Sequence, residues 1–193
     1  SPIDRRPKFH LYDPHIVLIS GIAWDHINVF PTFENYLEQF EVFIDQMKDG
    51  SVLTYCQADE TLDETVHEYG PHLDLRPYET PEYSIENGKS FIVRGSERVE
   101  VSVFGEHNLQ NLNGALMVCE AIGIDEDDFY EAIKDFKGAA RRLEEIGRND
   151  QTVVYKDFAH SPSKLDATVR AVKKQWPNRK LVACMELHTF SSL

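Results

Sequence analysis

The chain has 193 residues, of which 41% are hydrophobic, and a net charge of −13. This length can bury a core in one large domain or two small ones. An acidic chain with a pI near 5.0 argues against a nucleic-acid binder, because phosphate affinity needs a basic surface.

Targeting signals are absent from the sequence, and its cysteines are sparse. No apolar run approaches the ~20 residues that cross a membrane, and no signal peptide opens the chain, so we expect a cytoplasmic protein that does not enter membranes. Cys56, Cys119 and Cys184 lie far apart in apolar stretches, so buried reduced thiols are expected rather than disulfides.

The first seventy residues alternate between strand and helix patterns. The apolar run 15–22 predicts a strand buried on both faces. Thr32 is a suitable N-cap for a helix that extends to about Lys48 and ends at Gly50. A strand at 51–56 and a helix at 60–69 follow. This alternation predicts an α/β fold with a parallel sheet.

Residues 73–104 change to short strands. The runs 83–85 and 90–93 flank Asn87-Gly88, the dipeptide of a two-residue hairpin turn. A further strand pattern covers 99–104. We expect antiparallel strands at the edge of the parallel sheet.

The stretch from Gly105 to Asn111 stands where that strand hands over to a helix predicted over 107–121. Free N–H groups and the positive dipole end at a helix N-terminus favour a polar or anionic ligand. Asn108 and Asn111 are three residues apart and share a helix face. Helix capping is the alternative, and the spacing alone favours it.

The remaining sequence suggests a second domain. A helix begins at Asp125, and its acidic start over 125–128 is most simply a solvated helix terminus rather than a metal site. Small residues over 137–140 suit a hinge. Strands at 143–146 and 152–155, a helix at 163–176 and a strand at 180–187 then predict a new βαβ unit. We therefore expect domains at 1–138 and 139–193.

Both termini suggest that the chain is a fragment. Ser1 stands where a complete chain would start with Met, and the strand-like run 180–187 stops six residues before Leu193. A central parallel strand normally needs a following crossover. We expect a piece of a longer protein.

Polar side chains after the predicted strands are the candidates for chemistry. The sequence has no complete phosphate loop, GxGxxG, HExxH or GxSxG motif. Ligands of open α/β sheets collect at the carboxyl ends of strands, where His26, Asp157 and His160 are expected. Arg142 follows the hinge and could contact a phosphate. For each of these residues a loop, capping or solvated role is the structural alternative.

Four motifs, in order, resemble those of the Mur ligases, ATP-dependent enzymes that add amino acids or peptides to UDP-N-acetylmuramate. They are DH at 25–26, GxHNxxN at 105–111, FxGxxRR at 136–142 and a DYAHxP-like DFAHSP at 157–162.

The resemblance implies a fold, two cofactors and roles for the candidate residues. Residues 1–138 would be the later part of the central ATP-binding domain, and 139–193 the start of a Rossmann-like C-terminal domain. ATP and Mg²⁺ are the implied cofactors. His107, Asn108 and Asn111 would hold the adenine, His26 the Mg²⁺, and Arg142 the γ-phosphate, while Asp157 and His160 would face the nucleotide.

The resemblance also implies an acceptor. Residues 4–9 and the RRLE sequence at 141–144 are most similar to murein peptide ligases of the family. The expected reaction joins a recycled murein tripeptide, L-alanyl-γ-D-glutamyl-meso-diaminopimelate, to UDP-N-acetylmuramate through an acyl phosphate. The alternatives are L-alanine as acceptor, or a non-catalytic nucleotide-binding domain. The ELHT sequence at 186–189 departs from the common EPRS form, which leaves acceptor recognition and the roles of His188 and Thr189 open. Because the family's phosphate loop is not in the chain, we expect the chain alone to be inactive.

Overall fold

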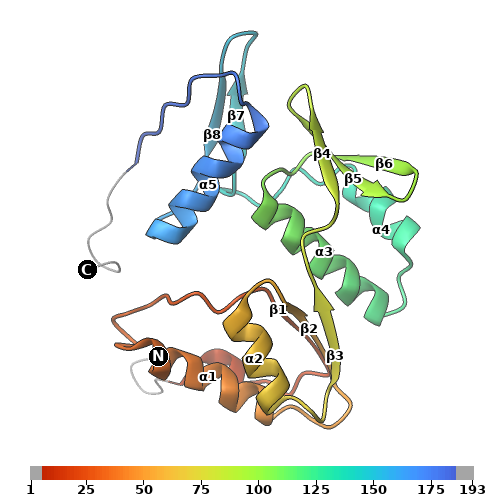
Figure 1. The fold of residues 1–193 in the computed structure, drawn as a ribbon, viewed down its shortest axis with the longest axis vertical. Helices are drawn as coiled ribbons and strands as arrows, with labels where there is room; N and C mark the ends of the chain where they lie inside the picture. The colour runs from red at the N-terminus through yellow and green to blue at the C-terminus, as the bar shows by residue number, and fades with distance from the viewer. Residues whose placement is uncertain (1–5, 186–193) are drawn as a thin grey trace. The chain divides into compact units, whose positions relative to one another are not determined.

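The computed structural model describes residues 6–185 (Figure 1). Their chain divides into two compact units, which we describe separately. The first contains residues 6–79 and 113–124, and the second contains 80–112 and 125–185. Our division into domains at 1–138 and 139–193 stays a prediction.

The first unit is built on a parallel sheet with strand order β1-β2-β3. Ile16 is opposite Val52 in register, and Val52 is opposite Asp74. The predicted alternation of strand and helix is confirmed. The elements are η1 (Lys8–Leu11), β1 (Ile16–Ile19), α1 (Phe33–Asp45), β2 (Val52–Cys56), α2 (Glu60–Tyr69) and β3 (Asp74–Tyr78).

Side-chain caps and an apolar core explain why these helices form where they do. The Thr32 hydroxyl accepts the Asn35 N–H at 3.2 Å, which starts α1 as predicted. Asp59 caps α2 by accepting the Leu62 N–H at 3.2 Å. The other oxygen of Asp59 accepts the Ile22 N–H at 2.8 Å, so this residue also fixes the loop after β1. The most buried apolar residues of the unit are Ile22, Ile44, Leu53, Tyr55, Cys56, Leu62 and Val66.

Two strand predictions were wrong in part. The run 15–22 was expected to be buried on both faces, but Leu18 is 38% exposed. Within residues 6–185, β1 pairs with β2 alone and forms an edge of the sheet, so one side of it has no neighbouring strand. The strand expected at 180–187 does not form over 180–185, where Val182 is 72% exposed. An extended segment without a pairing partner leaves its backbone to water. Residues 186 and 187 lie outside the described part.

The second unit contains two antiparallel sheets and the start of a long helix. The sheets are β4-β5-β6 and β7-β8, so the antiparallel strands form sheets of their own rather than extending the sheet of β3. Helix α3 continues beyond Leu112 into the residues of the first unit. The elements are β4 (Tyr83–Glu86), β5 (Lys89–Arg94), β6 (Glu97–Val101), α3 (Glu106–Ala121), α4 (Glu126–Ile133), β7 (Glu144–Arg148), β8 (Val153–Lys156) and α5 (Pro162–Gln175).

The hairpin between β4 and β5 is confirmed, and it receives the C-terminal end of α5. Asn87 and Gly88 both have positive φ, 52° and 75°, as a two-residue turn requires. The buried Gln175 donates to the Gly88 carbonyl at 2.7 Å and accepts from the Ser90 hydroxyl at 3.2 Å. A Cβ at Gly88 would lie 2.0 Å from the Trp176 ring, so only glycine fits below this indole.

The expected βαβ unit is not present in the described residues. Strand β8 pairs antiparallel with β7, and α5 leads into residues 180–185, which form no strand. The parallel partner that would make β8 part of a βαβ unit is therefore not formed by the described chain.

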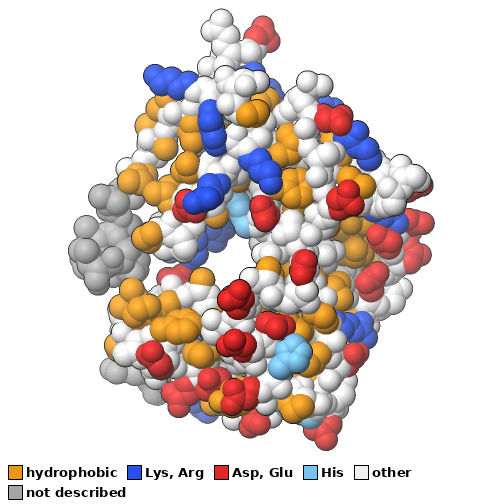
Figure 2. Space-filling view, in the orientation of Figure 1, with side chains coloured by type: hydrophobic (Ala, Val, Ile, Leu, Met, Phe, Trp, Pro, Cys, Tyr) orange, Lys and Arg blue, Asp and Glu red, His pale blue; other side chains and the backbone are white. Residues whose placement is uncertain are grey.

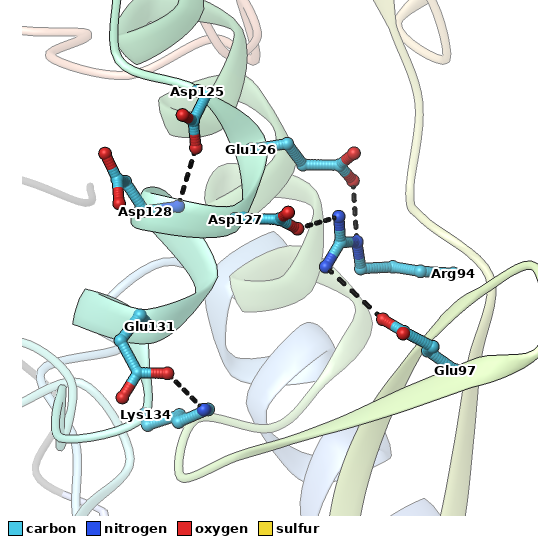
Figure 3. A network of polar contacts seen from close by, with 8 residues as sticks. All are labelled: Arg94, Glu97, Asp125, Glu126, Asp127, Asp128, Glu131 and Lys134. Atoms are coloured by element: carbon cyan, nitrogen blue, oxygen red, sulfur yellow. Dashed lines mark hydrogen bonds and ion pairs between the residues drawn. The ribbon is translucent and has the colours of Figure 1, made fainter.

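The sequence suggested that the acidic start of α4 is simply solvated, but two of its carboxylates bind an arginine. Asp125 caps the helix by accepting the Asp128 N–H at 2.8 Å. Figure 3 shows that Glu126 and Asp127 instead meet Arg94, which bonds them at 2.9 and 2.8 Å. These hydrogen bonds raise the pKa of Arg94, although burial acts in the opposite direction. Thus Arg94 joins β5 to α4.

The cysteines follow the local structure. Cys56 is buried and Cys119 is half-buried, but Cys184 is exposed, which corrects our expectation of three buried thiols. Its neighbours belong to no helix or strand that could cover it. All three are free. Over the described range, no helix has the length and apolar character needed to cross a membrane.

Candidate functional site

The candidate site in the second unit begins at the turn into α3. Gly105 has φ +88°, a conformation that glycine adopts without strain. A Cβ at this position would lie 2.6 Å from Cβ of Ala171 on α5 and 3.1 Å from Cε1 of His107. The missing side chain therefore lets α5 and the His107 ring approach the start of α3 closely.

The asparagines on the first turns of α3 differ in their surroundings. The side-chain amide of Asn108 donates to the Phe104 carbonyl at 2.8 Å. The backbone N–H of Asn108 donates to the Gly105 carbonyl at 2.9 Å. Asn108 therefore lies within the first turn of α3 and does not cap it in the way that the spacing favoured, because its amide donates to a carbonyl instead of accepting a helix N–H. Asn111 is exposed. A role of either amide in holding adenine stays a prediction.

His107 is half-buried and lies within electrostatic range of two other candidates. Burial lowers its pKa, the Asp157 carboxylate raises it, and the Arg142 guanidinium lowers it. A lowered pKa keeps the imidazole neutral at pH 7, so that one ring nitrogen donates and the other accepts. The structure thus brings together His107, Arg142 and Asp157 from three separate motifs.

Asp157 is the most connected of the predicted site residues. One carboxylate oxygen accepts the Leu143 N–H at 2.8 Å. The other accepts the Ala159 N–H at 2.7 Å and the Thr168 hydroxyl at 3.3 Å. It therefore ties the start of β7, the loop after β8 and helix α5 to one another.

Arg142 and His160 lie on the two loops that Asp157 connects. Arg142 is exposed, so its guanidinium is accessible to a ligand. The His160 ring is half-buried, has Nδ1 2.8 Å from the Phe158 carbonyl and stacks at a tilt on the Phe158 ring with 4.9 Å between centroids. The Phe158 carbonyl acceptor places the proton on Nδ1 and leaves Nε2 as an acceptor in the neutral ring.

His26, the predicted metal ligand, belongs to the first unit. It is exposed and has a positive φ of 57°, and its N–H donates to the Asp25 carboxylate at 2.8 Å. Among residues 6–185 no group of three His, Cys, Asp or Glu side chains could hold a metal. Mg²⁺ prefers oxygen and commonly uses only one or two protein ligands together with phosphates. These residues do not build a complete Mg²⁺ site, and the role of His26 stays a prediction.

The charge distribution adds a feature that our reading of the sequence missed. Residues 137–180 contain 11 Lys and Arg but 5 Asp and Glu, in a chain of net charge −13. Figure 2 shows basic side chains over β7, β8 and α5, and acidic side chains over α1 and α2. A count of charge by segment would have found this basic stretch, which suits a ligand rich in phosphate.

Comparison with known proteins agrees with the motifs. The sequence-family model described as the Mur ligase middle domain matches residues 4–119 of this chain. A UDP-N-acetylmuramate–L-alanine ligase from Lactobacillus delbrueckii subsp. bulgaricus is 31% identical over 198 residues, which cover 96% of this chain and 44% of that protein. The chain thus spans less than half the length of this relative.

Solved structures of the family share the fold. MurF ligase from Thermotoga maritima in complex with ADP has a TM-score of 0.69 at 16% identity, covering 86% of this chain and 40% of that one. MurC from Thermotoga maritima has a TM-score of 0.67 at 19% identity, covering 91% and 42%. A murein peptide ligase from Psychrobacter arcticus has 0.59 at 21%, covering 92% and 38%. Together with the match to the middle domain, these findings show that the chain belongs to the Mur ligase family.

Proposed function

We propose that the full-length protein containing this chain is an ATP-dependent ligase that joins L-alanine to UDP-N-acetylmuramate. The observation that carries this proposal is the 31% identity, over 96% of the chain, to a UDP-N-acetylmuramate–L-alanine ligase. A tripeptide acceptor was our first expectation. It is supported by the RRLE sequence at 141–144, while the similarity to a murein peptide ligase structure, at 21% identity, concerns the fold alone.

The proposed reaction passes through an acyl phosphate. ATP would transfer its γ-phosphoryl group to the lactyl carboxylate of the sugar nucleotide and leave as ADP. The amine of the acceptor would then attack the acyl carbon, and the tetrahedral intermediate would collapse to the amide and inorganic phosphate. The protein's task in such a reaction is positioning and charge neutralisation rather than covalent catalysis.

The residues of the second unit suit a nucleotide. Arg142 offers an exposed guanidinium, the preferred planar partner of a phosphate. The neutral His107 and the amides of Asn108 and Asn111 can both donate and accept at the edge of a base. Mg²⁺, when bound, would neutralise phosphate charge, and His26 is the residue of this chain that we propose as its ligand.

Acceptor choice is tested with the full-length gene product by measuring phosphate release from ATP in the presence of UDP-N-acetylmuramate. We expect release with L-alanine and little with L-alanyl-γ-D-glutamyl-meso-diaminopimelate. If the protein prefers the tripeptide, L-alanine is not the acceptor and our first expectation of a murein peptide ligase is correct. Nucleotide binding without phosphate release for either acceptor would favour a non-catalytic nucleotide-binding domain.

The site itself is tested with Arg142→Ala. Removing a group that stabilises developing charge costs about 10²–10³-fold in kcat, and we expect a loss of that order. Arg170→Ala is the matched control, because this arginine is exposed on α5 and pairs one helical turn away with Asp166 at 2.7 Å. Equal activity of the two variants would exclude Arg142 from the reaction.

A further inference from the structure

The turn that carries Arg142 has an unusual backbone on both sides of this residue. Arg141 has φ 59° and Leu143 has φ 47°, so two non-glycine residues out of three adopt the left-handed region. Residues with a Cβ adopt it rarely and at a cost, and such a conformation persists only where the surroundings enforce it. Leu143 is also buried, in a cluster with Phe104 and Ala171, so the turn is anchored on one side.

Two carboxylates hold the backbone of this turn. Oε2 of Glu144 accepts the Arg141 N–H at 2.8 Å, and Oδ2 of Asp157 accepts the Leu143 N–H at 2.8 Å. The Phe158 N–H donates to the Arg141 carbonyl at 2.9 Å. Hydrogen bonds from N–H groups to ionised carboxylates are stronger than neutral ones. Charged partners therefore hold the peptide group that precedes Arg141 and the one that follows Arg142, while the peptide group between Arg141 and Arg142 is held by the Phe158 N–H.

We call the hydrogen bonds from the Glu144 and Asp157 carboxylates to this turn the clamp. The clamp sets the direction in which the turn presents Arg142. Leu143 packs with Phe104 and Ala171 beside the start of α3, and the charge of Arg142 is one of the causes that lower the pKa of His107 there, after burial. With an ordinary right-handed backbone at Arg141 or Leu143, the chain would leave the turn in another direction and carry the guanidinium with it.

We propose that Glu144, together with Asp157, is a positioning residue that enforces the left-handed turn and so directs Arg142 toward the phosphates of the bound nucleotide. This inference deepens the proposed function and rests on it for the identity of the ligand. Glu144 acts through Arg142 and does not itself touch the substrate. The clamp itself is a property of the protein without ligand.

The test uses Glu144→Ala and Glu144→Gln in the full-length gene product. The Gln amide oxygen can still accept the Arg141 N–H, whereas Ala cannot. We expect Glu144→Ala to lower kcat for phosphate release about tenfold, because it removes the hydrogen bond, while Glu144→Gln stays within about twofold of the parent, because its neutral amide oxygen still accepts the Arg141 N–H. Glu145→Ala is the matched control, since the neighbouring carboxylate pairs with Arg148 instead.

A second readout needs no nucleotide. The pKa of His107 is measured by NMR of ¹³C-labelled histidine, with the signal assigned by His107→Gln. Arg142→Gln should raise this pKa by removing the nearby positive charge, and Glu144→Ala should move it in the same direction. Arg141→Gly added to Glu144→Ala should reverse part of the effect, because glycine adopts the left-handed conformation without strain. This double variant also serves if Glu144→Ala alone does not fold.

The outcomes separate this inference from the proposed function. Parent-like kcat and an unchanged His107 pKa in Glu144→Ala would overturn the clamp, as would equal losses in the Ala and Gln variants. A shifted His107 pKa together with no phosphate release by the parent protein would leave the clamp in place and overturn the proposed function.

Discussion

Replacement of Gly105 by alanine tests the close approach of α3 and α5 most directly. At φ +88° the new side chain would be strained by about 1–2 kcal/mol, as for other residues forced into the left-handed region. Its Cβ would also lie 2.6 Å from Cβ of Ala171, and overpacking of this kind costs about 1–3 kcal/mol. We expect Gly105→Ala to reduce the free energy of unfolding by about 2–5 kcal/mol, the sum of these two effects.

Gly95→Ala is the matched control for the conformational part. Gly95 also has a positive φ, 59°, but a Cβ there would meet nothing within 4 Å. Gly95→Ala should therefore reduce the free energy of unfolding by only about 1–2 kcal/mol. The gain from a stiffer unfolded chain is common to both variants and cancels in their difference.

The assay is urea unfolding followed by the fluorescence of Trp176, with Trp24 replaced by phenylalanine so that the signal reports on the second unit. Ala171→Gly costs about 1 kcal/mol in a helix by itself but should recover about 1–3 kcal/mol when combined with Gly105→Ala. Equal losses in Gly105→Ala and Gly95→Ala, or strict additivity with Ala171→Gly, would refute the contact between the two helices.

Three further perturbations address a cap, an ion pair and a titrating group. Thr32→Ala removes the cap of α1 and should cost about 1 kcal/mol in urea unfolding. Arg94→Met should cost about 0.5–2 kcal/mol at low salt and less in 1 M NaCl, because its acidic partners are largely exposed and salt screens them. Asp127→Asn should cost less than half as much stability as Arg94→Met, because the Asp127 side chain is 86% exposed. The lowered pKa of His107 means that the unfolded state takes up its proton first as pH falls, so stability is full above about pH 6.5 and decreases below it. The urea midpoint should therefore fall more between pH 7.5 and 5.5 in the parent than in His107→Gln.

Each of these expectations has a clear contrary result. An unchanged midpoint in Thr32→Ala would show that α1 does not depend on its cap. A salt-independent loss in Arg94→Met would assign the effect to packing on Tyr130, 4.7 Å from the guanidinium, rather than to the acidic partners. Parallel pH profiles of the parent and His107→Gln would show that the histidine is as easily protonated in the folded state as in the unfolded chain.

Local chemistry made most helices and turns predictable. Thr32 caps α1, Asn87-Gly88 closes a hairpin and the helix over 60–69 has the predicted bounds, because each depends on hydrogen bonds and φ preferences within a few residues. The motif residues were also visible in the sequence. Their spacing could not show which of them meet, since His107, Arg142 and Asp157 are separated by up to 50 positions.

The sequence by itself determined where most helices begin, the small-residue turns and the family motifs. The tertiary structure decided which strands pair, that Glu126 and Asp127 meet Arg94, and that the carboxylates of Glu144 and Asp157 hold the turn around Arg142. The physical reason is range. Caps and turns satisfy backbone groups from their own neighbourhood, whereas the partner of a charged side chain or an edge strand depends on which distant segments the fold brings beside it.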